Sequence, residues 1–159
     1  MFVLKTWQLG CHVFMIQLAY MEKFVRIFTD GGARGNPGPA GSGAVLYEIS
    51  SDGNQKIVAE ISEYLGIATN NQAEYQAIVL ALKKAKELGY KSVEMFMDSE
   101  LAVKQINGEY KVKNEELAKK FLEIYNLRQS FDNISFTHVR RDKNKEADAQ
   151  VNEAIDANV

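Results

Sequence analysis

Four acidic residues stand at positions where their carboxylates could share one site. Asp30 and Asp98 each end a stretch that is predicted to be a β-strand, whereas Glu74 and Asp148 each fall in the first turn of a predicted helix. If the two strands are adjacent and parallel, Asp30 and Asp98 lie side by side. Both helix starts can then direct their acids at the same point. The pattern therefore suggests a carboxylate cluster assembled from four separate elements.

Such a cluster has a definite chemistry. Like charges in a partly buried site repel one another, so four carboxylates are stable together only when hard cations bind them. Mg²⁺ and Mn²⁺ favour carboxylate and water oxygens in octahedral geometry. Two such ions about 3.5–4 Å apart are a recurring device for in-line displacement at a phosphodiester. We therefore expect metal-dependent phosphodiester hydrolysis, with two Mg²⁺ ions per site when substrate is bound and Mn²⁺ as a substitute. The predicted metal ligands and catalytic residues are Asp30, Glu74, Asp98 and Asp148.

Position alone leaves a simpler explanation open. The chain has 21 acidic residues, and most acids of a soluble protein serve its solubility. An acid in the first turn of a helix is favourable because of the helix dipole alone. An aspartate at the end of a strand is a common turn former. The residues that flank the four acids must therefore decide between the two interpretations.

The hydrophobic periodicity predicts an α/β domain. Alternation and β-forming residues predict strands over residues 24–30, 44–49, 55–65, 92–98 and 134–139. Spacings of three and four predict helices over residues 71–88, 99–106, 114–129 and 145–157. Residues 31–43 hold six glycines and both prolines, which indicates a sharply turning loop. Three meandering strands followed by alternating helices and strands imply a mixed sheet with helices packed on it.

Length and composition fit one globular domain. The chain has 159 residues, of which 46% are apolar and 25% charged. Its net charge of −2 is unusual for a nucleic-acid enzyme, although the four acids contribute to it. This charge predicts a modest substrate affinity that falls steeply with salt. The single cysteine excludes an internal disulfide and suits a reducing cytoplasm, and with only two histidines a zinc site is disfavoured.

The first twenty residues differ from the rest. Fourteen of them are apolar, but polar residues interrupt the segment, so no apolar run reaches the roughly 18 residues that span a bilayer. A basic start and a cleavage site typical of signal peptides are also missing. We expect residues 1–22 to be an N-terminal extension, with Met21 as the natural start, ahead of a domain over residues 23–158. The alternatives are a hydrophobic arm that packs on the domain or on a dimer, and a poor membrane anchor. We also expect the protein to be a cytoplasmic monomer that has no membrane partner.

The flanking residues resemble a known family. Thr29-Asp-Gly-Gly-Ala-Arg-Gly-Asn-Pro-Gly-Pro-Ala-Gly-Ser-Gly-Ala44 is similar to the first catalytic segment of type 1 ribonuclease H. Thr69-Asn-Asn-Gln-Ala-Glu-Tyr-Gln-Ala77 is similar to the second, Asp98-Ser99 followed by Leu101 to the third, and Asn144-Lys-Glu-Ala-Asp148 to the fourth. Each segment is weakly specific, but all four occur in order. The resemblance runs from Phe24 to about Ala157.

The resemblance implies both a fold and a function. The fold is a ribonuclease H-like five-stranded mixed sheet, three antiparallel strands then two parallel ones, with helices on both faces. The function is hydrolysis of the RNA strand of RNA–DNA hybrids by two metal ions, giving 5′-phosphate and 3′-hydroxyl ends, with a side activity on double-stranded RNA as a further option. The alternative is a hybrid-binding module without activity. Implied substrate contacts are Gly31, Gly32, Asn36, Thr69, Asn70, Asn71, Glu100, Arg140, Arg141 and Asn144. Helix capping and turn formation remain alternative roles for Asn36 and Asn70.

Three departures from the family pattern bear on mechanism. Many members carry a histidine on a loop before the fourth acid, but here residues 139–144 hold none. His138 falls within a predicted strand, which leaves Arg140 or Arg141 as alternative phosphate contacts. The short segment 108–114 leaves no room for the basic protrusion of many bacterial members, so the chain resembles compact, archaeal-like ones. Glu100 stands where relatives often have glutamine.

Overall fold

The computed structural model describes residues 23–159. The predictions for residues 1–22 therefore lie outside the described residues. Five strands and four α-helices follow one another in the expected order, with a short 3-10 helix, η1, at Arg141–Lys143. The elements are β1 (Phe24–Ala33), β2 (Gly38–Ile49), β3 (Gln55–Ala68), α2 (Asn70–Glu87), β4 (Ser92–Met97), α3 (Glu100–Ile106), α4 (Glu115–Arg128), β5 (Asn133–His138) and α5 (Lys145–Asp156).

The strands form one mixed sheet in the order β3-β2-β1-β4-β5. β1 pairs antiparallel with β2, and β2 with β3. β1 pairs parallel with β4, and β4 with β5. The expected five-stranded mixed sheet is confirmed. Asp30 does not end its strand as predicted, because β1 continues to Ala33 in its pairing with β2. The parallel pairing with β4 stops at Thr29 and Met97, so Asp30 and Asp98 both follow directly after its last pair.

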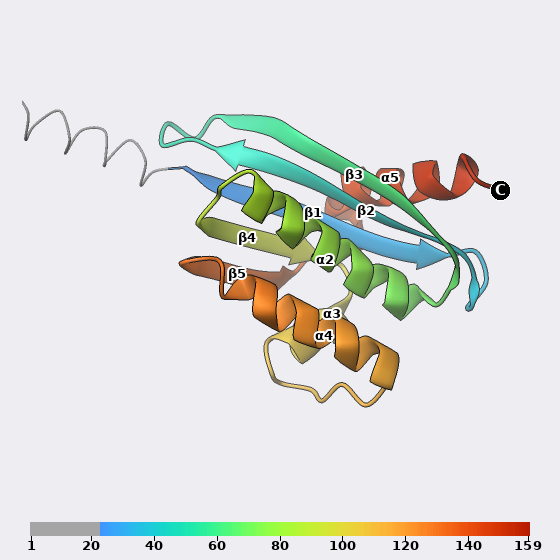
Figure 1. Ribbon diagram of the computed structural model, residues 1–159. Helices are drawn as coiled ribbons and strands as arrows, with labels where there is room; N and C mark the ends of the chain where they lie inside the picture. Colours follow the sequence, from blue (N-terminus) through green and yellow to red (C-terminus); the bar gives the residue numbers. More distant parts are fainter. Residues whose placement is uncertain (1–22) are drawn as a thin grey trace, which may run out of the picture.

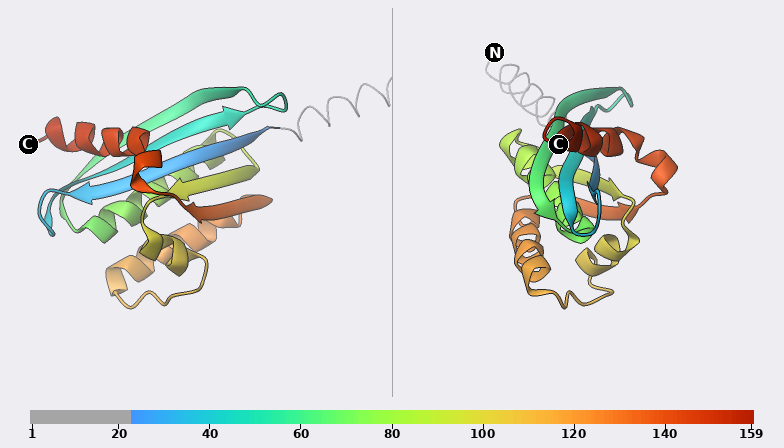
Figure 2. Two further views of the ribbon diagram at one scale, coloured as in Figure 1. Left: turned by 180° about the vertical axis from the view of Figure 1, so that it is seen from behind. Right: turned by 90° about the vertical axis from the view of Figure 1, so that its right-hand side faces the viewer.

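Helices cover both faces of the sheet (Figures 1 and 2). α2 packs on β1 and β2, and α4 lies outside α2 on the same side. α5 packs on the opposite face against β2, β3 and β1. Alternate residues of the central strands, such as Val25, Ile27 and Met95, are buried under α2, which carries an almost unbroken buried stripe. The sheet is therefore a fixed frame against which the starts of α2 and α5 are set.

The glycine-rich segment differs from the expected loop. β1 continues through Ala33 and β2 begins at Gly38, so only residues 34–37 turn. The glycines instead admit helices close to the sheet. A Cβ on Gly31 would lie 2.2 Å from the backbone carbon of Ala73 in α2, and one on Gly43 would lie 2.4 Å from the carbonyl oxygen of Ala147 in α5. Glycine in a strand often marks such close backbone approach, which the sequence pattern cannot distinguish from a turn.

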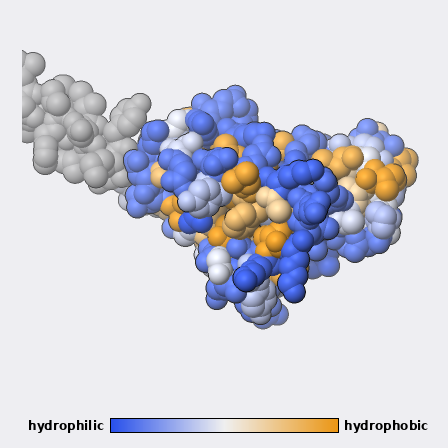
Figure 3. Space-filling model, turned by 60° about the horizontal axis from the view of Figure 1, so that its bottom comes forward, coloured by the Kyte–Doolittle hydropathy of each residue, from blue (hydrophilic) through white to orange (hydrophobic). Residues whose placement is uncertain are grey.

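The surface seen in Figure 3 is largely hydrophilic, interrupted by patches of apolar residues. Leu122 and Tyr125 of α4 are among the exposed large hydrophobic side chains. Within residues 23–159, no helix is long and apolar enough to cross a membrane.

The close approach of α2 to β1 can be tested with two neighbouring glycines. Gly31→Ala should lower the free energy of unfolding by about 3 kcal/mol, since backbone rather than a flexible side chain opposes the new methyl group. Gly32→Ala is the matched control, because its Cβ would meet only Val151 Cγ1 at 3.5 Å, an ordinary contact. It should stay within about 1 kcal/mol of the native protein. Urea unfolding measures both, and equal losses would contradict this account of the segment.

Candidate active site

Three of the four predicted acids meet at the carboxyl ends of the central parallel strands. Asp30 in β1, Glu74 in α2 and Asp98 directly after β4 each offer a carboxylate oxygen, and these oxygens lie within 4.8 Å of one another. Asp30 is 5% exposed and Glu74 is 9% exposed, whereas Asp98 is more accessible. The group is thus buried on one side and open to solvent on the other.

Local sequence explains how Glu74 reaches the two aspartates. Thr69 caps α2, with its hydroxyl accepting from the Gln72 N–H while the Gln72 side chain accepts from the Thr69 N–H. This reciprocal capping box fixes where the helix begins. Because Gly31 lets the first turn of α2 lie against β1, Glu74 faces the ends of the strands. The capping pair and the glycine together set the position of the second acid.

The fourth acid stands beside this group rather than in it. Asp148 lies in the first turn of α5 and is partly exposed. The Arg141 guanidinium lies between it and the cluster, with Nη2 3.9 Å from Asp148 Oδ1 and Nε 4.0 Å from Asp98 Oδ2. Asp148 also contributes to raising the pKa of Asp30, so it belongs to the same electrostatic neighbourhood.

The electrostatics of the cluster favour a bound cation. Burial, with Asp98 and Asp148 adding to it, raises the pKa of Asp30 to about 8. Burial and the charges of Asp30 and Asp98 raise the pKa of Glu74 well above its ordinary value. Among the described residues, Glu74 Oε2 is buried without a hydrogen-bond partner. An all-oxygen donor set with an orphaned buried carboxylate oxygen fits hard divalent ions such as Mg²⁺ or Mn²⁺.

The raised pKa of Asp30 gives the metal-free protein a pH dependence. A carboxyl group whose pKa is near 4 when unfolded and about 8 when folded retains its proton preferentially in the native state. Stability should therefore fall as pH rises from 4 to 8 in EDTA, by an amount on the order of a few kcal/mol. Asp30→Asn should reduce this slope, with Glu74 accounting for what remains, and should exceed the native protein in stability at pH 8. Chemical denaturation at several pH values measures it, and parallel profiles for the two proteins would contradict the shift.

Asn144 was predicted to contact substrate, which remains a prediction, and in this structure it has a positioning role. Its side chain is 1% exposed, and its Nδ2 donates to the Thr29 carbonyl oxygen at 2.9 Å. The backbone carbonyl oxygen of Asn144 accepts a hydrogen bond from the Asp148 N–H at 3.1 Å. Because Thr29 precedes Asp30, Asn144 ties the start of α5, which carries Asp148, to the part of β1 that carries Asp30. The sequence motif located an important residue, but burial makes it a positioning residue.

Replacing Asn144 should therefore loosen the start of α5. Asn144→Ala leaves the buried Thr29 carbonyl without its donor, so the free energy of unfolding should fall by about 2 kcal/mol. Asn126→Ala on exposed α4 is the matched control and should change stability by about 0.5 kcal/mol or less. Thermal or urea unfolding compares the two, and an unaffected Asn144→Ala protein would contradict the positioning role.

Several predicted substrate contacts do share one surface. Asn36, Thr69 and Asn71 line a depression at the start of α2. Asn70 is exposed there, yet it also binds locally: its N–H donates to Asn36 Oδ1 at 3.1 Å and its Oδ1 accepts from the Ala33 N–H at 2.8 Å. These bonds join the β1–β2 turn to the helix.

Sequence reasoning missed three residues that line the same depression, the polar Gln72 and Asn114 and the apolar Leu117. The Thr69-x-x-Gln72 spacing is a capping-box signal that could have identified the first. Asn114 caps α4 and is far away in sequence, so no local signal places it there.

The other predicted contacts are placed differently. Gly32 is partly exposed, whereas Gly31 is buried where its lack of a side chain admits α2. The substrate contacts predicted for these two glycines remain predictions. Glu100 is exposed in the first turn of α3, where it binds Lys104 at 2.8 Å. Arg140 is exposed and pairs with Asp142 at 3.4 Å.

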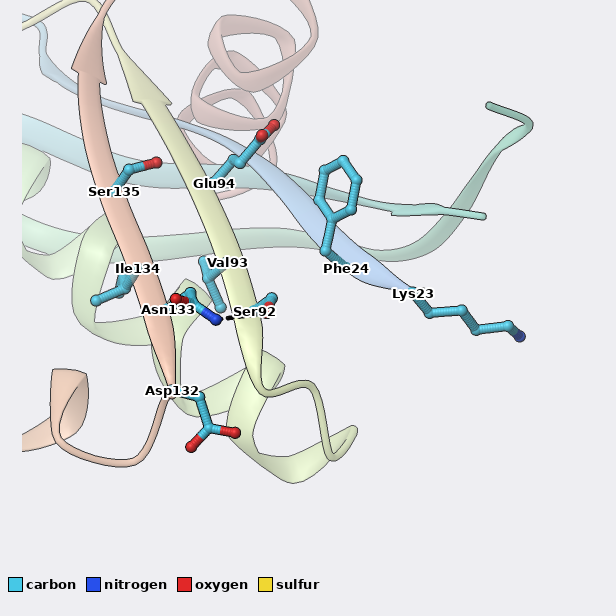
Figure 4. Close-up of a pocket in the computed structure, with 9 residues that line it drawn as sticks. All are labelled: Lys23, Phe24, Ser92, Val93, Glu94, Asp132, Asn133, Ile134 and Ser135. Carbon is cyan, nitrogen blue, oxygen red and sulfur yellow. Dashed lines mark hydrogen bonds between the residues drawn. The ribbon is translucent and has the colours of Figure 1, made fainter. Parts of the chain in front are cut away.

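A second hollow lies at the opposite ends of the strands (Figure 4). Its lining includes Lys23, Ser92 and Asp132 at the amino ends of β1, β4 and β5. In Figure 4 the only two acids labelled there, Glu94 and Asp132, point in different directions from different ends of the hollow. Glu94 is engaged by Arg26 at 2.9 Å. This hollow lacks the converging carboxylates of the first site.

Comparison with known proteins agrees with this geometry. Residues 28–154 match the family described as "Reverse transcriptase-like". Ribonuclease HI of Halobacterium salinarum is 45% identical over 132 residues, which cover 83% of this chain. The crystal structure of ribonuclease H1 from that archaeon superposes with a TM-score of 0.77 at 44% identity, over 84% of this chain and 98% of that one. The chain belongs to the type 1 ribonuclease H family.

Two further relatives of the type 1 ribonuclease H family are informative. The LC11 ribonuclease H1 in complex with an RNA/DNA hybrid is 46% identical with a TM-score of 0.75, covering 84% of this chain and 97% of that one. The bifunctional protein of Mycobacterium tuberculosis is 41% identical over 84% of this chain. The chain spans 64% of the length of the halobacterial enzyme and 36% of the mycobacterial protein. As a type 1 ribonuclease H it is of the compact form, because only residues 107–114 separate α3 from α4.

Proposed function

We propose that this chain hydrolyses the RNA strand of RNA–DNA hybrids with two divalent ions, leaving 5′-phosphate and 3′-hydroxyl ends. The observation that carries the proposal is the convergence of Asp30, Glu74 and Asp98 within 4.8 Å, with Asp148 beside them, in a chain of the type 1 ribonuclease H family. The related LC11 enzyme whose structure contains an RNA/DNA hybrid supports the substrate class.

The four carboxylates hold the ions in this proposal. Bound Mg²⁺, or Mn²⁺ in its place, would supply an activated water and neutralise charge at the scissile phosphate and the leaving 3′ oxygen. Asp30 and Glu74 form the buried wall of the site, where low polarity strengthens their attraction for a cation. Asp98 and Asp148 form its open side, where the phosphate enters.

Proton transfer in this site does not rest on a histidine among residues 23–159. His138 is the only histidine of that part of the chain. It ends β5, is exposed, and its charge acts on Glu100 of α3. A guanidinium group has five N–H donors and no acceptor, so Arg140 and Arg141 can contact phosphate but cannot accept a proton as general bases.

Hybrid recognition uses the depression at the start of α2. Asn36 and Asn71 are exposed amides there, and the positive dipole end of α2 lies at the same surface. These groups suit a phosphate of the DNA strand, while the RNA strand lies at the carboxylates. The 2′-hydroxyls of the RNA, read in the minor groove, distinguish it from DNA. Tolerance of double-stranded RNA would follow if the depression accepts either sugar.

The direct test is cleavage of end-labelled substrates by the full chain. We expect Mg²⁺- or Mn²⁺-dependent cutting of the RNA in a hybrid, less cutting of double-stranded RNA, and none of double-stranded DNA. The products should carry 5′-phosphate ends. Hybrid binding without cleavage in either metal would favour the alternative of a non-catalytic binding module and would contradict the proposal.

Two acids of β4 and its end provide a matched pair of variants. Asp98→Asn removes a proposed ligand and should lower the rate of hybrid cleavage by at least about 100-fold, since loss of even an outer contact of a metal ligand costs 10- to 100-fold. Glu94→Gln changes an acid on the same strand that binds Arg26 instead, and should retain near-native turnover. Circular dichroism should show both variants folded. Equal activity of the two would refute the assigned site.

A further inference from the structure

Arg141 places its guanidinium between two carboxylates that belong to different elements. Its Nη2 lies 3.9 Å from Asp148 Oδ1 and its Nε lies 4.0 Å from Asp98 Oδ2. Both distances exceed those of hydrogen bonds, so the attraction is one of charge rather than of fixed geometry. The side chain is 82% exposed. It is therefore held at the mouth of the site by its counter-charges and has solvent on its other side.

The neighbouring arginine shows that this placement is specific. Arg140 carries the same charge one residue earlier and is 86% exposed. Its guanidinium pairs with Asp142 at 3.4 Å. The difference arises because Arg140 precedes η1 whereas Arg141 is its first residue. Two arginines of equal charge and similar exposure thus differ in whether they contact the metal-binding acids.

We propose that Arg141 is a displaceable counter-ion: it bridges Asp98 and Asp148 in the metal-free protein and leaves when a divalent cation binds these carboxylates. The proposal rests on the metal site of the proposed function. A guanidinium has five N–H donors and no acceptor, so it cannot ligate a cation and must compete with it for the same oxygens. Its exposure allows it to swing into solvent without repacking of the core.

Displacement gives Arg141 two opposite effects. Without metal, the positive charge of Arg141 lessens the repulsion between the carboxylates of Asp98 and Asp148. These two carboxylates lie at the open side of the site, beside Asp30 and Glu74, whose pKa values are already raised. With metal, the broken contacts weaken binding. Exposed ion pairs are individually weak, so the effect on the dissociation constant of Mg²⁺ should be about threefold to tenfold.

The test is a calorimetric titration of the metal-stripped full chain with MgCl₂ alone. Arg141→Ala should bind Mg²⁺ about threefold to tenfold more tightly than the native protein. Arg140→Ala removes an equal charge from the same segment and should shift the dissociation constant by less than about twofold. A dissociation constant for Arg141→Ala that equals or exceeds that of Arg140→Ala would overturn the proposal.

Melting temperatures provide a second measurement that needs neither nucleic acid nor turnover. In EDTA, Arg141→Ala should melt below Arg140→Ala, and saturating MgCl₂ should remove or reverse that difference. A constant difference in both buffers would overturn displacement. If the native chain bound neither Mg²⁺ nor Mn²⁺, the metal site and the proposed function would fail together. Native binding with unchanged affinity in Arg141→Ala defeats only the role of Arg141.

Discussion

The mutual repulsion of carboxylates at one edge of the sheet is the constraint on which the rest of this structure depends. Asp30 and Glu74 are nearly buried, so water screens their charges little, and the pKa of each is raised. A flexible chain would separate such groups. Here each is carried by an element whose position is fixed by many other contacts: Asp30 and Asp98 follow the last parallel pair of β1 and β4, Glu74 lies just past the first turn of α2, and Asp148 lies in the first turn of α5. The stability of the core thus offsets a local electrostatic cost.

The devices that fix these elements are small and local. Gly31 and Gly43 remove side chains where the two helices approach the sheet, on opposite faces. The Thr69–Gln72 capping box sets the start of α2, and Asn144 ties the start of α5 to the carbonyl that precedes Asp30. None of these residues needs to touch a substrate to matter for the reaction. Each acts on the distance between acids, which determines whether a cation can be shared.

The open side of the site is more exposed to solvent than the buried side. Asp98 and Asp148 are partly exposed, and an exposed arginine lies between them. This gradient from a buried wall to an exposed mouth suits the proposed uptake of ions and a phosphodiester from solvent. The charged groups placed at this mouth include the carboxylates and Arg141 of η1, and His138 pairs in register with Met97, the residue before Asp98.

The sequence by itself determined the order of elements, the mixed sheet and the four acids, because periodicity and short motifs are local properties. It could not show that the glycine segment is mostly strand, since a glycine that admits a helix looks the same as one that makes a turn. It also assigned Asn144 to substrate, although burial makes it a tether. Only the tertiary structure placed Asn114 in the depression near Asn36. It also showed that three of the acids converge while the fourth, Asp148, stands apart beside Arg141. Distances between residues remote in sequence depend on how helices seat on the sheet, and no local pattern encodes them.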